Sequence, residues 1–137
     1  MSRRVLVDTS AWLAVTDASD IHHAQAADIY TQLLNAHSSL VVTILVMAET
    51  QIWLRRKFGP DAALAFLKNI NESTRIEVVY PDSLLEKKAK GILRQYADQD
   101  FSLADAISFA WLKDAGVSDV FAYDRHFATA GFNLVTK

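Results

Sequence analysis

Short runs of β-branched and aromatic residues alternate in this sequence with longer segments whose apolar residues recur at helical spacing. This alternation is typical of a parallel sheet whose strands are joined by helices that cover its faces. We expect strands at residues 4–7, 40–43, 76–80, 120–123 and 133–135. We expect helices at residues 10–15, 22–36, 44–58, 60–70, 82–97 and 102–115. The sequence therefore predicts an α/β fold, a three-layer α/β/α sandwich around a central parallel sheet of about five strands.

Glycine and proline are scarce in this chain, and they mark predicted helix ends without forming a linker-like segment. Gly59 suits the end of one helix and Pro60 the first turn of the next. The chain has four glycines and two prolines, with no low-complexity stretch and no internal repeat. A length of 137 residues is typical of one globular domain. We therefore expect residues 1–137 to form a single domain.

The composition excludes several classes of protein. The absence of cysteine rules out disulfides, thiol catalysis and cysteine-ligated metal sites, and it fits a reducing cytoplasm. The residues before Asp8 include too few apolar side chains for a signal peptide. The longest apolar stretch, 40–48, has about half the length of a membrane span. We expect a cytoplasmic protein with no membrane segment.

The charge of the chain does not by itself indicate a nucleic-acid-binding protein. The formal net charge is −2, whereas nucleic-acid-binding domains are often strongly basic. Basic residues cluster at 55–57, 87–94 and 125–126, but a solvated helix surface is the simpler explanation of each cluster. Any binding of nucleic acid is therefore expected to be local.

Two acidic residues follow predicted strands. Asp8 follows the apolar strand 4–7, and Asp124 follows the strand 120–123. Parallel strands finish at the same edge of a sheet, and ligands of open α/β sheets bind in the crevice beyond that edge. Asp8 and Asp124 are therefore expected to meet there.

Two further acidic residues lie on predicted helices in apolar company. Leu45, Ile52 and Trp53 are helical neighbours of Glu49, so we expect the face that carries Glu49 to point inward. Asp105 lies in the helix 102–115, among residues that are almost all apolar. Both side chains are expected to be largely removed from water.

Three of these four acids also have a purely structural explanation. Asp8 could cap the helix that follows it, and Asp105 could form a capping box with Ser102. Asp124 could form a turn with Arg125. No capping position explains Glu49. One shared site accounts for all four acids together.

A cluster of buried carboxylates needs a cation, because ionised carboxylates repel one another and lose hydration on burial. Oxygen ligands favour Mg²⁺ or Mn²⁺ over zinc, and the four histidines do not have a zinc-binding spacing. An acidic site that holds Mg²⁺ is suited to phosphoryl transfer, since the ion activates water and stabilises the leaving oxygen. Hydrolysis of a phosphodiester is therefore the predicted chemistry.

Four short motifs follow one another along the chain: VDTSAW at 7–12, AET at 48–50, FSLADA at 101–106 and YDRHF at 123–127. Together they resemble the PIN domain, most closely the VapC-type toxins of bacterial toxin–antitoxin pairs. The resemblance covers essentially the whole chain. It implies a PIN fold, an Mg²⁺- or Mn²⁺-dependent endoribonuclease, a homodimer, and inhibition by a cognate antitoxin protein.

The resemblance also implies roles for individual residues. The catalytic and metal-binding positions fall on the four acids already singled out, Asp8, Glu49, Asp105 and Asp124. The hydroxyl side chains expected to support them are those of Thr9, Ser10 and Ser102. Arg125, beside the last acid, is expected to hold the RNA backbone.

One departure from the family pattern leaves an alternative function open. Many relatives carry Thr or Ser two residues before the last acid, whereas this chain has Ala122. A PIN-like module that binds RNA or a partner without cutting would fit that loss. A signalling receiver domain is a further alternative, but it needs an acid at the end of the third strand, where Asp82 comes late.

Overall fold

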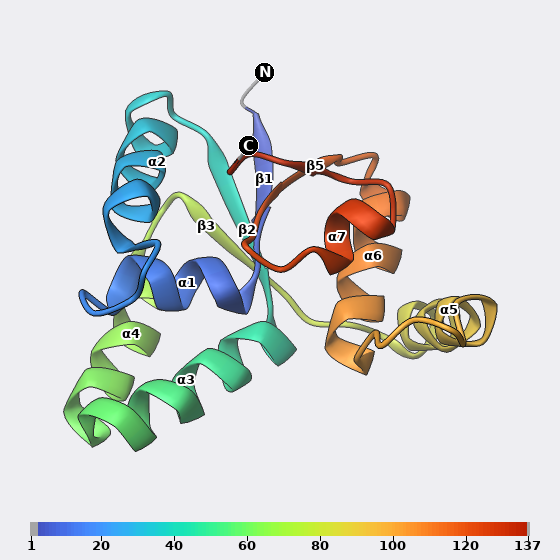
Figure 1. Ribbon diagram of the computed structural model, residues 1–137, viewed down its shortest axis with the longest axis horizontal. Helices are drawn as coiled ribbons and strands as arrows, with labels where there is room; N and C mark the ends of the chain where they lie inside the picture. Colours follow the sequence, from blue (N-terminus) through green and yellow to red (C-terminus); the bar gives the residue numbers. More distant parts are fainter. Residues whose placement is uncertain (1–2, 137) are drawn as a thin grey trace.

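A parallel five-stranded sheet forms the centre of the protein in the computed structural model, which describes residues 3–136 (Figure 1). The strand order is β3-β2-β1-β4-β5, and every neighbouring pair is parallel. The strands are β1 (Arg4–Val7), β2 (Ser39–Thr43), β3 (Ile76–Val79), β4 (Asp119–Phe121) and β5 (Asn133–Leu134).

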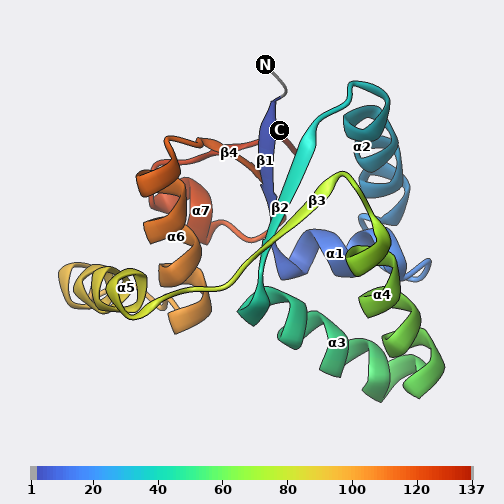
Figure 2. The same cartoon turned by 180° about the vertical axis from the view of Figure 1, so that it is seen from behind.

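Helices cover both faces of this sheet, as Figures 1 and 2 show from opposite sides. Side chains of a strand alternate between the two faces, so Val5 and Val7 join one core cluster and Leu6 joins the other. The first cluster includes residues of α1 to α4, and the second includes residues of α5 to α7. The helices are α1 (Thr9–Thr16), α2 (His23–Asn35), α3 (Ile44–Phe58), α4 (Pro60–Glu72), α5 (Ser83–Gln95), α6 (Leu103–Ala115) and α7 (His126–Thr129). The predicted three-layer α/β/α sandwich is confirmed.

The strand order creates a switch point between β1 and β4. The chain builds β1, β2 and β3 outward in one direction and then returns to place β4 and β5 on the other side of β1. Val7 pairs with Phe121, so the two strands finish level with each other. A crevice is expected beyond the carboxyl ends of strands at such a point, and Asp8 and Asp124 follow these two strands.

The boundary between α3 and α4 follows the prediction. Gly59 has a φ of 97°, a left-handed conformation that glycine adopts without strain. Pro60 then occupies the first turn of α4, where its missing N–H costs nothing. In the described residues, 3–136, no helix is both long and apolar enough to cross a membrane.

The C-terminal region departs from the prediction in two respects. β4 ends at Phe121 and not at residue 123, because the Tyr123 backbone N–H donates to Ser10 Oγ at 2.9 Å and the chain leaves the ladder. The helix α7 was not predicted, since four residues are too few to display helical periodicity. Both differences lie next to Asp124 and affect how that acid is held.

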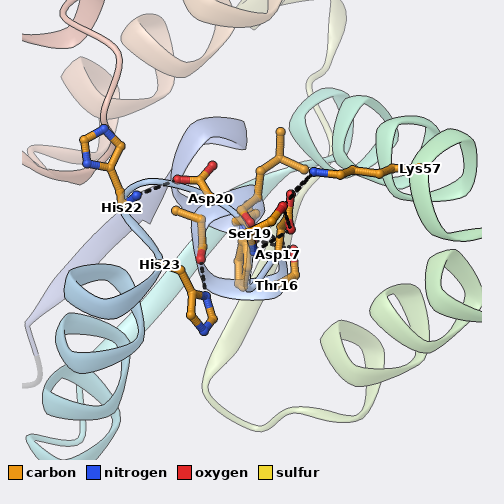
Figure 3. A network of polar contacts seen from close by, with 10 residues as sticks. Thr16, Asp17, Ser19, Asp20, His22, His23 and Lys57 are labelled. Atoms are coloured by element: carbon orange, nitrogen blue, oxygen red, sulfur yellow. Dashed lines mark hydrogen bonds and ion pairs between the residues drawn. The ribbon is translucent and has the colours of Figure 1, made fainter.

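The connection between α1 and α2 is tied to the end of α3 by an ion pair between the buried Asp17 carboxylate and the exposed Lys57 side chain (Figure 3). Lys57 Nζ lies 2.6 Å from Asp17 Oδ2 and donates to Ser19 Oγ at 3.0 Å. The Lys57 ammonium holds the pKa of the Asp17 carboxyl down at about 2, with the Ser19 hydroxyl contributing. Lys57, a member of the predicted basic cluster 55–57, therefore has an internal partner.

Candidate active site

A cavity of about 310 Å³ lies at the carboxyl edge of the sheet, where β1 and β4 end. It brings together side chains from four separate parts of the chain. Its lining residues are Asp8, Thr9, Ser10, Leu13, Glu49, Ser102, Asp105 and Asp124. All four predicted acids and all three predicted supporting hydroxyl residues therefore line one pocket.

Asp8 is the most deeply placed of the four acids, with 6% of its surface exposed. It directly follows β1, and its backbone N–H donates to Phe121 O at 3.0 Å, which joins it to the end of β4. Asp8 stands at the N-cap position of α1, yet its side chain makes no capping hydrogen bond within the described residues. Capping therefore does not explain this carboxylate.

Burial raises the pKa of Asp8 from its ordinary value of 3.8 to about 7. The charge of Asp105 adds to this effect, and those of Asp124 and Glu49 add less, while a hydrogen bond from the Thr9 backbone opposes them. Ser10 Oγ lies 3.3 Å from Asp8 Oδ2 and donates to it. Ionising Asp8 near neutral pH therefore calls for a nearby positive charge.

Glu49 reaches the pocket from α3, but the predicted inward-facing position is wrong. Glu49 is exposed, and its helical neighbours Ile52 and Trp53 are 39% and 37% exposed. The face of α3 that packs inward carries Val46, Met47, Thr50 and Leu54. Glu49 is on a different side of α3 from these inward-packing residues, so its side chain reaches only the rim of the pocket.

Thr9 connects Glu49 to the end of β1. Its Oγ1 donates to Glu49 Oε1 at 3.3 Å. The pKa of Glu49 is raised, mainly by loss of hydration and in part by the charge of Asp105, while the Thr9 hydrogen bond opposes the rise. Two of the four acids thus favour the protonated form more than a free carboxyl would.

Asp105 has both roles that the sequence left open. It forms a complete capping box: Ser102 Oγ accepts from the Asp105 N–H at 3.0 Å, and Asp105 Oδ2 accepts from the Ser102 N–H at 3.0 Å. The same carboxylate lines the acidic pocket. The cap therefore holds a pocket acid in a defined position.

His126 is a site residue that the sequence prediction missed, since it was assigned only to a basic cluster. Its backbone N–H donates to Asp124 Oδ1 at 2.8 Å, which forms the turn predicted for Asp124. Its ring Nδ1 lies 3.0 Å from Asp105 Oδ2 and 3.4 Å from Asp124 Oδ1. A histidine two residues after the last acid, at the start of a short helix, is the signal that could have identified it.

Comparison with known proteins identifies the family of this chain. A profile of the PIN domain matches residues 5–133. The chain belongs to the PIN domain family. It is 31% identical over 128 residues to a 23S rRNA-specific endonuclease, VapC20, of Mycobacterium tuberculosis, covering 93% of this chain and 95% of that protein. It is also 29% identical over 125 residues to the ribonuclease VapC26 of the same species, covering 90% of each chain.

Solved structures agree with the PIN assignment. The crystal structure of VapC20, described as a Sarcin-Ricin loop cleaving toxin, superimposes with a TM-score of 0.85 at 30% identity and covers 94% of this chain and 96% of that one. DNA-bound VapBC from Salmonella typhimurium superimposes with a TM-score of 0.65 at 13% identity, covers 98% of this chain and 97% of that one, and supports the fold alone. The predicted PIN fold and VapC-type ribonuclease class are confirmed.

Three other predicted features can now be placed on the PIN fold. Arg125 is exposed and adjoins Asp124, but it does not line the pocket. Ala122, where many PIN relatives carry a hydroxyl, is fully buried in the core beneath α6 and α7. Asp82, the acid considered for a receiver domain, caps α5 by accepting from the Leu85 N–H at 2.8 Å and lies outside the acidic pocket.

A larger cavity of this PIN domain lies elsewhere and is mostly apolar. It has a volume of about 720 Å³ and is lined by residues of α1 to α4, including Trp12, Tyr30 and Phe66. Within the described residues, it shares no lining side chain with the acidic pocket. The density of carboxylates, and not cavity size, locates the chemistry.

Replacing Ser102 with alanine should separate capping from catalysis. Losing the hydroxyl that accepts from the Asp105 N–H is expected to lower the free energy of unfolding by about 1 kcal/mol. The contact to the Asp105 carboxylate comes from the Ser102 backbone and survives, so RNA cleavage should change little. Asp82→Ala, which removes the cap of α5, is the matched control for urea unfolding. A large loss of cleavage in Ser102→Ala alone would give the hydroxyl a direct part in the reaction.

Proposed function

We propose that this chain is an Mg²⁺- or Mn²⁺-dependent endoribonuclease that hydrolyses phosphodiester bonds at the acidic pocket. The observation that carries this proposal is the meeting of Asp8, Glu49, Asp105 and Asp124 in one pocket. Glu49 and Asp105 lie on α3 and α6, whereas Asp8 and Asp124 lie in the connections that follow β1 and β4, at the switch point of the sheet. Structural acids scattered over a surface would have no reason to converge there.

The residues present fit a divalent ion. The pocket offers four carboxylates, and the buried one, Asp8, needs a cation to ionise fully near neutral pH. Hard divalent ions such as Mg²⁺ and Mn²⁺ are bound by carboxylate oxygens. When bound, such an ion supplies an activated water and neutralises charge on the phosphate. PIN domains use divalent metals in general, and the choice of Mg²⁺ or Mn²⁺ is our proposal.

The other pocket residues orient the carboxylates. Thr9 donates to Glu49, and Ser10 donates to Asp8 while it accepts from the Tyr123 N–H. Ser10 therefore connects the loop after β4 to the acid after β1. Arg125 is exposed next to Asp124, where its guanidinium can pair with the RNA backbone beside the scissile phosphate.

We further propose that the chain acts as the toxin of a toxin–antitoxin pair in the cytoplasm. The solved structure of VapC20, which is 30% identical to this chain, is described as that of a toxin, and this supports an antitoxin protein as partner. The identity to VapC20 supports ribosomal RNA as the first substrate to test. Homodimerisation, expected from the sequence resemblance, stays a prediction.

Incubation of the purified protein with RNA tests this function directly. We expect cleavage of a Sarcin-Ricin loop hairpin in Mg²⁺ or Mn²⁺, and complete loss of cleavage in EDTA that excess Mn²⁺ reverses. Gel analysis of end-labelled RNA measures the products, with a transfer RNA and an unstructured oligonucleotide as comparison substrates. RNA binding without divalent-dependent turnover would support the alternative, a binding module that does not cut.

A further inference from the structure

One residue holds two of the four pocket acids. The His126 ring Nδ1–H donates to Asp105 Oδ2 at 3.0 Å, and the His126 backbone N–H donates to Asp124 Oδ1 at 2.8 Å. The ring Nδ1 also lies 3.4 Å from Asp124 Oδ1. Because a carboxylate offers only lone pairs, the proton of this ring bond must lie on Nδ1. His126 thus links an acid of α6 to the acid that follows β4.

These bonds occupy one oxygen of each carboxylate and leave the other available. Asp105 Oδ2 accepts from the His126 ring and from the Ser102 N–H at 3.0 Å. Asp124 Oδ1 accepts from the His126 N–H. Within residues 3–136, Asp105 Oδ1 and Asp124 Oδ2 accept no hydrogen bond, and both residues line the acidic pocket. Each acid therefore has one free oxygen for a ligand.

The position of His126 is itself fixed by aromatic packing. Its ring stands edge-on to Phe101, with centroids 5.3 Å apart and planes at 74°. The next residue, Phe127, is fully buried and stands edge-on to Phe109 with centroids 5.0 Å apart. Phe101 contacts Phe109 in the same way. The aromatic cluster therefore anchors both the ring and the backbone that carry the two donors.

We propose that His126 is a positioning residue that makes Asp105 and Asp124 one-oxygen ligands of the divalent ion. This inference rests on the proposed function, in which that ion is bound by the four acids. Mg²⁺ requires compact octahedral ligation, whereas Ca²⁺ is larger and accepts both oxygens of a carboxylate. The His126 ring withholds one oxygen of Asp105 together with the Ser102 N–H, and the His126 backbone N–H withholds one oxygen of Asp124. This arrangement favours Mg²⁺ and Mn²⁺ over Ca²⁺. Hydrogen-bonded partners of metal ligands commonly orient them in this way.

A different role for the same residue is direct ligation. Single ligand atoms of Asp105, Asp124 and His126 lie within 4.8 Å of one another, close enough to hold one ion. The ring bond to Asp105 favours positioning, since Nδ1 is already used as a donor. Substitutions that mimic one ring nitrogen at a time distinguish the two roles.

Three variants and one control form the test. In His126→Asn the amide nitrogen takes the place of Nδ1, in His126→Gln it takes the place of Nε2, and His126→Phe keeps the ring packing without a donor. His22→Asn is the matched control, because His22 is an exposed histidine outside the acidic pocket. Mn²⁺ binding to the RNA-free protein is followed by electron paramagnetic resonance, with displacement by Mg²⁺ and by Ca²⁺. Thermal unfolding checks that each variant is folded.

We expect His126→Asn and His22→Asn to keep nearly the wild-type affinity for Mn²⁺. His126→Phe and His126→Gln keep the backbone N–H on Asp124 and lose the ring donor to Asp105. Both should bind Mn²⁺ about 10–100-fold more weakly, and their preference for Mg²⁺ over Ca²⁺ should shrink. Wild-type Mn²⁺ affinity in His126→Phe would overturn the proposal. So would full retention in His126→Gln with loss in His126→Asn, since the glutamine amide oxygen could then ligate the ion from the position of Nε2, which assigns Nε2 as a ligand in the wild-type protein.

The outcomes also separate this proposal from the proposed function. If His126→Phe does not fold, the Asn and Gln variants decide between the Nδ1 and Nε2 roles by themselves. Failure of the wild-type protein to bind Mn²⁺ would contradict the metal site, and with it the positioning role. Binding of Mn²⁺ that follows the predicted order of variants, in a protein that cuts no RNA, would support the positioning role and contradict only the nuclease function.

Discussion

Replacing Asp8 with asparagine is expected to lower RNA cleavage by about 10³-fold or more. Asp8 follows β1 and is hydrogen-bonded to the end of β4 through its backbone N–H. Its side chain is only 6% exposed, so solvent cannot supply a substitute ligand for the ion when the carboxylate is lost. Asparagine preserves the shape of the side chain, removes the negative charge and replaces one carboxylate oxygen by an NH₂ group. The measurement is the initial rate of RNA cleavage at saturating Mn²⁺, compared with the rate of the wild-type protein.

Asp82→Asn is the control for this substitution. Asp82 stands at the N-cap of α5, where asparagine caps as well as aspartate, and it lies outside the acidic pocket. The control should cleave RNA at the wild-type rate. If Asp8→Asn were as active as Asp82→Asn, the pocket could not be the site of the reaction.

The metal-free protein should become less stable as the pH rises from about 4 to about 7. The pKa of Asp8 is about 7 in the folded protein and 3.8 as its ordinary value, so the folded state binds the proton more tightly. Stability therefore falls where the unfolded chain has lost that proton and the folded protein still holds it. The difference corresponds to a loss of up to about 4 kcal/mol. The raised pKa of Glu49 acts in the same direction.

Urea unfolding in EDTA at pH 5 and pH 8 measures this effect. Asp8→Asn should flatten most of the pH dependence and should be more stable than the wild-type protein at pH 8, whereas Asp82→Asn should not. The lowered pKa values of Asp17 and Asp119 affect stability only below about pH 4 and do not confuse the comparison. A metal-free protein that gained stability between pH 5 and pH 8, in step with Asp8→Asn, would contradict the raised pKa.

The Asp8 carboxylate is expected to support activity at the expense of the stability of the metal-free protein. A carboxylate that is buried beside other carboxylates destabilises the metal-free fold, and the same charge is what binds a divalent ion. Adding Mn²⁺ at pH 8 should therefore stabilise the wild-type protein far more than Asp8→Asn. Sites that hold functional charges commonly reduce stability in this way.

The sequence predicted the ends of a helix or strand well where those ends are set by residues close by in the chain. α3 begins after Thr43, whose Oγ accepts from the Val46 N–H, and ends at Gly59, so both of its ends follow from side chains near in sequence. β1 likewise has its predicted bounds. The end of β4 was less well predicted, because a bond from Tyr123 to the distant Ser10 decides where that strand ends. The helix α7 was missed because four residues are too few to display helical periodicity.

The same distinction applies to the pocket. The capping box of Asp105 could be expected from Ser102 three residues earlier. The exposure of Glu49 could not be predicted, because it depends on which side of α3 packs against its neighbours. His126 escaped prediction for a similar reason, since its ring partner Asp105 lies 21 residues away in the chain.

The sequence by itself predicted most of the strands and helices and singled out the four acids, because helical and strand periodicity, caps and motif order are properties of neighbouring residues. Only the tertiary structure decided that these acids meet, how each is hydrogen-bonded, and that His126 holds two of them. Asp8 and Asp124 become neighbours because β1 pairs with β4. That pairing joins strands far apart in the sequence and depends on how the whole sheet packs between its two helical layers.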